Sequence, residues 1–64
     1  MQPSYQQRVI DEKSELDAKL SSLAYFIESK EFDKIDSLNQ ELLNQQAEIM
    51  FNYSQILEKR IKLF

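Results

Sequence analysis

The stretch Tyr5–Ile27, YQQRVIDEKSELDAKLSSLAYFI, decides the fold class. Its apolar residues recur at spacings of three, four and seven, which predicts one face of an amphipathic α-helix about 36 Å long. This stripe consists of Val9, Leu16, Leu20, Leu23 and Ile27. Ser4 and Gln7 form an S-x-x-Q capping box at the helix start. Lys13 interrupts the stripe, and we assign it only as a solvated or ion-paired lysine.

The next segment, ESKEFDKIDS, breaks this periodicity. Phe32 and Ile35 are three residues apart and predict one short helical turn folded back onto the hairpin core, with Ser29 as its cap. Ser37 opens a second capping box, so the second helix is predicted from about Ser37 to Leu63. Two long helices joined by a short helical turn predict an all-α antiparallel hairpin that forms a single domain.

The second helix carries two adjacent stripes at alternating spacings of three and four. The inner stripe is Leu43, Ala47, Met50, Ser54, Leu57, Ile61 and Phe64, and the outer stripe is Leu42, Gln46, Ile49, Tyr53, Ile56, Arg60 and Leu63. One partner helix covers only one such stripe. The other stripe needs a different molecule, so we expect the hairpin to assemble into a homo-oligomeric helical bundle.

The composition of the 64 residues excludes several functions. The chain has no cysteine, histidine or glycine, so disulfides, thiol nucleophiles, histidine bases and glycine-rich phosphate loops are excluded. We therefore expect no enzyme, cofactor or metal. A net charge of −3 argues against binding to DNA or RNA polymers, including a small DNA-binding regulator. The chain has neither a long apolar run nor a leader pattern, so we expect no membrane span and a location in the cytoplasm where the protein is made.

Several side chains allow both a structural and a ligand-binding interpretation. Tyr5 is either a packing residue at the open end of the hairpin or a flat surface for a nucleobase. Lys19 is either a solvated lysine covering the seam or a phosphate ligand. Arg60 serves the helix dipole or pairs with an acidic residue of a neighbouring subunit. Tyr5 and Lys19 are about 21 Å apart along one helix, so a small ligand touching both must lie between subunits.

Several segments carry a resemblance to a known family: YQQRVIDEKSELDAKL, FIES, Phe32 and the terminal ILEKRIKLF. In these segments the chain resembles the phage anti-CBASS cyclic-nucleotide sponges, of the crAss-phage type. The resemblance spans essentially the whole chain. It implies a compact hairpin that assembles into hexamers and encloses cyclic dinucleotide signals of the cGAMP type between subunits without cleaving them. This starves the antiviral effector of its activator.

The resemblance also implies roles for individual residues. Tyr5 matches the base-stacking tyrosine, Lys19 and Ser21 match a lysine and hydroxyl pair that contacts the ligand, and Arg8 supports the same pocket. Better-known sponges use a glycine-containing C-terminal segment to build a second pocket for cyclic trinucleotides. This chain has no glycine, so only Arg60 remains as a candidate for that site. The alternative function is a structural or adaptor helical bundle that binds another protein.

Overall fold

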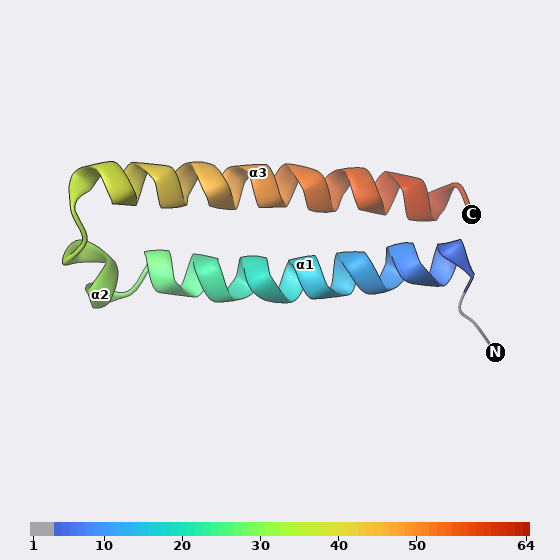
Figure 1. Cartoon of the computed structure of the whole chain (residues 1–64), viewed down its shortest axis with the longest axis horizontal. Helices are drawn as coiled ribbons and strands as arrows, with labels where there is room; N and C mark the ends of the chain where they lie inside the picture. Colours follow the sequence, from blue (N-terminus) through green and yellow to red (C-terminus); the bar gives the residue numbers. More distant parts are fainter. Residues whose placement is uncertain (1–3) are drawn as a thin grey trace.

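The computed structural model describes residues 4–64, and all the regular secondary structure in that range is α-helical. Helix α1 spans Tyr5–Ile27, the short helix α2 spans Lys30–Asp33, and helix α3 spans Ser37–Lys62. The two long helices run antiparallel and side by side, and α2 forms the corner between them (Figure 1). The rod measures 47 × 21 × 14 Å. The predicted hairpin and the predicted bounds of both long helices are confirmed.

The seam between α1 and α3 is formed by the two stripes that the sequence predicts to meet. Val9 on α1 and Leu57 on α3 are buried, with Leu57 fully hidden from solvent. The rest of the α3 inner stripe is half-buried, apart from buried Ser54 and exposed Phe64. A core this small leaves much of the apolar surface of a 64-residue chain exposed.

The outer stripe of α3 is exposed along its whole length. Leu42, Ile49 and Ile56 are 50%, 66% and 52% exposed. Tyr53, Leu63, Gln46 and Arg60 are exposed as well. The hairpin therefore covers one α3 stripe and leaves the other open, as the spacing predicts.

The structure confirms two of the predicted N-cap positions and corrects the third. The Ser4 hydroxyl accepts from the backbone N–H of Gln7 at 3.2 Å, as predicted. The Gln7 side chain donates to Asp11 at 2.9 Å instead of back to Ser4, so only half of the predicted capping box forms. Ser29 is the N-cap residue of α2, as predicted, but its hydroxyl makes no capping hydrogen bond and donates instead to the carbonyl of Phe26 at 2.6 Å. Asp36, rather than Ser37, caps α3, because its carboxylate accepts from the N–H of Asn39 at 3.2 Å. Ser37 is already inside the helix.

The corner packs back onto the hairpin as expected from Phe32 and Ile35, which are both half-buried. The rings of Phe26 and Phe32 meet edge to face with centroids 6.2 Å apart. The Gln40 side chain donates to the carbonyl of Phe32 at 2.9 Å, so α3 is tied to the corner. Over residues 4–64, neither long helix has the apolar length needed to cross a bilayer.

Candidate ligand-binding face

Two contacts across the seam define the two sides of the hairpin. At its open end, the rings of Tyr5 and Phe64 meet edge to face with centroids 5.7 Å apart. On the other flank of the seam, a polar cluster joins Asp17 of α1 to Ser54 of α3. An α-helix turns by about 100° per residue, so Tyr5 and Asp17 point about 120° apart around α1. We call the two flanks of the seam the Tyr5 side and the Asp17 side.

Tyr5 is the first residue of α1 and is held in place by the cap at Ser4. Its edge contact with Phe64 leaves the side chain 65% exposed. Edge-to-face contact uses the rim of one ring, so aromatic surface stays available for stacking. The position is compatible with both interpretations drawn from the sequence, since the same ring packs on Phe64 and remains open to a ligand.

Arg8 and Lys19 lie on the Tyr5 side as well. Arg8 is one turn beyond Tyr5, about 60° around the helix, and Lys19 is four turns beyond it, about 40° around. Both side chains are exposed. The continuous α1 helix confirms an axial separation of about 21 Å between Tyr5 and Lys19. One hairpin therefore presents a ring and a cation that no single nucleotide can bridge.

Arg60 shares this side from α3. It lies one turn before Phe64, about 40° around that helix, and belongs to the outer stripe. Within residues 4–64 its guanidinium takes part in none of the ion pairs. The Tyr5 side of the hairpin thus combines an exposed ring, three exposed cations and the exposed outer stripe of α3.

Ser21 is on the Asp17 side. It follows Asp17 by one turn and points about 40° from it, and its side chain is exposed. Residues two apart on a helix do not share a face, so Lys19 and Ser21 point about 160° apart. The two side chains therefore leave α1 in different directions.

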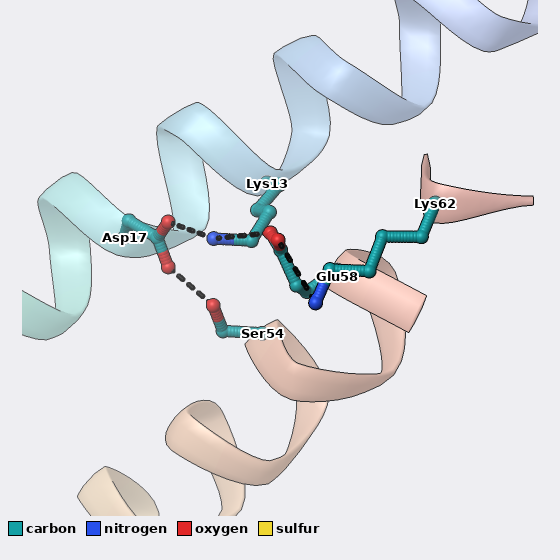
Figure 2. A network of polar contacts seen from close by, with 5 residues as sticks. All are labelled: Lys13, Asp17, Ser54, Glu58 and Lys62. Atoms are coloured by element: carbon teal, nitrogen blue, oxygen red, sulfur yellow. Dashed lines mark hydrogen bonds and ion pairs between the residues drawn. The ribbon is translucent and has the colours of Figure 1, made fainter. Parts of the chain in front are cut away.

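The polar cluster on the Asp17 side explains Lys13 (Figure 2). The Lys13 ammonium lies 2.6 Å from the Asp17 carboxylate and 3.7 Å from that of Glu58. The hydroxyl of the buried Ser54 donates to the other oxygen of Asp17 at 2.5 Å. Lys62 lies 4.0 Å from Glu58 at the edge of the cluster. Lys13 is therefore an ion-paired seam residue, which confirms the structural interpretation.

The hydrogen bonds within the cluster shift the ionisation of its members. The hydrogen bond to Asp17 raises the pKa of the Lys13 ammonium. The hydrogen bonds from Lys13 and Ser54 lower the pKa of Asp17. Each charge in this pair has its partner within the hairpin, so the cluster holds the register of α1 against α3 and offers no free charge to a ligand.

The described residues of a single hairpin enclose no pocket. No group of three or more acidic side chains in residues 4–64 is arranged to hold a metal ion. Sequence reasoning singled out Tyr5 without its partner Phe64. The inner stripe ends at Phe64, so the helical spacing could have predicted that the two rings meet at the open end.

Comparisons with known proteins identify one family and one relative. A family model that bears the description Sequestin matches residues 3–63. A relative described as an uncharacterized 7.5 kDa protein in the denB–rIIB intergenic region of Enterobacteria phage T4 is 41% identical over 61 residues, which is 95% of each chain. No solved structure matches the chain. The matching family is one of binding proteins rather than of enzymes.

Proposed function

The chain belongs to the Sequestin family, which confirms the resemblance to the phage anti-CBASS sponges, and we propose that it sequesters cyclic dinucleotides of the cGAMP type without cleaving them. By holding these signals in the host bacterial cytoplasm, it blocks activation of CBASS effectors. The observation that carries this proposal is the exposed Tyr5 ring on the same side of the hairpin as Lys19, about 21 Å away along α1.

This separation requires a pocket shared between subunits. Tyr5 of one copy meets Lys19 of another, and the lysine and hydroxyl pair of Lys19 and Ser21 contacts the same ligand. The exposed outer stripe of α3 supplies the apolar surface that holds copies together. A hexamer is the assembly that the resemblance implies.

The side chains on the Tyr5 side match the chemistry of the ligand. A tyrosine ring stacks on a nucleobase, which contributes about 1–3 kcal/mol per base. Lys19 and Arg8 neutralise the phosphodiesters through charge-assisted hydrogen bonds, and Ser21 supplies a hydroxyl. The sequence contains no histidine or cysteine to activate water or attack phosphorus. The chemistry of the site therefore favours binding over turnover.

Calorimetry of the purified protein against a panel of cyclic di- and trinucleotides tests the proposal. We expect heat with at least one cyclic dinucleotide, and heat denaturation should return that ligand chemically intact. Linear or cleaved nucleotide in the recovered sample would refute sequestration. Heat with cyclic trinucleotides that disappears in Arg60→Ala would support a second site at Arg60.

The shared pocket has its own test, by mixing two inactive variants. Tyr5→Ala and Lys19→Ala each remove one part of the pocket, so each alone should bind weakly. A mixed oligomer contains some sites with wild-type Tyr5 from one chain and wild-type Lys19 from the other, so mixing should restore part of the binding. Phe64→Ala is the control, because it removes the partner of Tyr5 within the hairpin but keeps the stacking ring. Failure of rescue in oligomers shown to be mixed by mass spectrometry would contradict a shared pocket.

The second candidate is an adaptor that binds another protein through the same outer stripe. The exposure of that stripe is the observation in its favour. An adaptor predicts no heat with any cyclic nucleotide, so the calorimetric panel separates the two functions.

A further inference from the structure

The outer stripe of α3 has nearly the same pattern in both directions. From Leu42 to Leu63 its residues are Leu, Gln, Ile, Tyr, Ile, Arg and Leu, with Tyr53 at the centre. The leucines lie at the two ends, the isoleucines flank the tyrosine, and a long polar side chain lies between each isoleucine and its leucine. A twofold rotation therefore places leucine opposite leucine and isoleucine opposite isoleucine. Such a self-complementary surface is the property of an isologous interface.

The charges of α3 are arranged with the opposite sign in its two halves. The acidic Glu41 and Glu48 lie in the first half, and Lys59, Arg60 and Lys62 outnumber Glu58 in the last turns. An antiparallel pair of α3 helices places the acidic half of each copy beside the basic half of the other. A parallel pair places Lys59 and Arg60 beside the same cations of the second copy, which is unfavourable. The dipoles of two long helices add to the antiparallel preference.

We infer that the outer stripe docks on the outer stripe of a second copy, with the two α3 helices antiparallel about a twofold axis close to Tyr53. The inference rests on the proposed oligomer and specifies one of its interfaces. Leu42 of one copy then approaches Leu63 of the other, and the isoleucines pack on either side of the axis. The Gln46 carbonyl of one copy comes within reach of the Arg60 guanidinium of the other, so both polar side chains of the stripe gain a partner.

Helix α1 is a poorer partner for this stripe. The surface of α1 on the Tyr5 side carries the charged side chains Arg8, Glu12, Glu15 and Lys19. Docking the stripe there would desolvate these four charges opposite leucine and isoleucine, and Arg60 is the one charged side chain that the stripe offers them. Pairing α3 with itself leaves these α1 side chains accessible, including Arg8 and Lys19, the cations assigned to the cyclic dinucleotide.

Cysteine cross-linking tests the direction of the pair, and the chain contains no native cysteine. Leu42 and Leu63 are 21 positions apart on α3, about 32 Å along its axis. In an antiparallel pair, Leu42→Cys therefore lies far from its own copy but close to Leu63→Cys of the other chain. The two variants are refolded together, one of them carrying an affinity tag, and treated with a short bis-maleimide.

We expect the mixed Leu42→Cys and Leu63→Cys sample to give cross-linked heterodimer, and Leu42→Cys alone to give none. Asn44→Cys is the matched control, since Asn44 is exposed on the opposite face of the same turn and should lose the cross-link with Leu63→Cys. Self-cross-linking of Leu42→Cys, or equal cross-linking from Asn44→Cys, would overturn the inference.

Light scattering and calorimetry on the wild-type protein keep this outcome separate from the proposed function. An oligomer that binds a cyclic dinucleotide but gives no heterodimeric cross-link would refute the antiparallel pair and leave sequestration intact. A heterodimeric cross-link in a protein that binds no cyclic nucleotide would support the pair and refute the sponge.

Discussion

Ile56 and Leu57 are adjacent on α3, and substitutions at these two positions test whether another subunit covers the outer stripe. Leu57 is fully buried by α1, whereas Ile56 is 52% exposed. Replacing a buried leucine with alanine costs about 2–5 kcal/mol, and a thin two-helix layer that can collapse favours the lower half of that range for Leu57→Ala. Leu57→Val is a milder substitute if the alanine variant does not fold.

The expected cost of Ile56→Ala depends on whether the stripe is covered. Ile56→Ala removes three carbons, worth about 2.4 kcal/mol when fully covered at about 0.8 kcal/mol per methylene group. The hairpin alone covers roughly half of this side chain, so the expected cost in a monomer is about 1 kcal/mol. In an oligomer that covers the stripe, the cost should instead approach about 2–3 kcal/mol and should depend on protein concentration.

Urea unfolding followed by circular dichroism, at protein concentrations spanning two orders of magnitude, measures both costs, and light scattering gives the assembly at each concentration. We expect the urea midpoint of Ile56→Ala to lie below that of the wild type, by an amount that changes with protein concentration. Light scattering should show that the wild type is an oligomer. A cost near 1 kcal/mol at every concentration, together with a monomeric wild-type mass, would refute the assignment of the outer stripe as an interface.

Three further predictions concern the ligand site and the seam. Tyr5→Ala should weaken cyclic dinucleotide binding by about 1–3 kcal/mol per stacked base in calorimetry, whereas Tyr5→Phe keeps the ring face and should stay close to wild type; equal losses would contradict stacking. Lys19→Ala should weaken binding by about 1.5–3 kcal/mol, and this loss should shrink between low and high salt because exposed charges are screened; a loss independent of salt would contradict a phosphate contact. Because its pKa is lowered in the folded chain, Asp17 stabilises the hairpin above its ordinary pKa of 3.8, and this stability is lost as pH falls below that value. The midpoint of thermal unfolding should therefore fall steeply with decreasing pH in the wild type and less steeply in Asp17→Asn. An unchanged pH dependence in Asp17→Asn would show that other carboxylates cause the fall.

Much of the fold follows from helical periodicity. The stripes assign Leu57 to the seam and Ile56 to the open face, and the burial of the two side chains agrees. The role of Lys13 could not be derived in this way, because the cluster around it joins Asp17 to Ser54, 37 positions along the chain. Spacing within one helix does not show which charges face each other across the seam.

The caps and the site show two other limits of the sequence. Asp36 and Ser37 are adjacent and both are good caps, so only the path of the chain after α2 decides between them. The placement of Lys19 and Ser21 on opposite flanks of α1 follows from their spacing of two, whereas their shared contact with a ligand comes from the family resemblance alone. The shared pocket also requires a neighbouring subunit, which one chain does not contain.

The position of the corner helix α2 has a practical consequence for following this protein in solution. The start of α1 and the end of α3 lie together at the other end of the rod, next to the Tyr5 and Phe64 rings (Figure 1). A fluorescent protein or a surface tether fused to either terminus therefore crowds the aromatic end. The exposed Lys34, which follows α2 almost a full rod length away, is a better attachment point for a dye or a bead. Its ion pair with Glu31 is local to the corner, so modifying it leaves the seam intact.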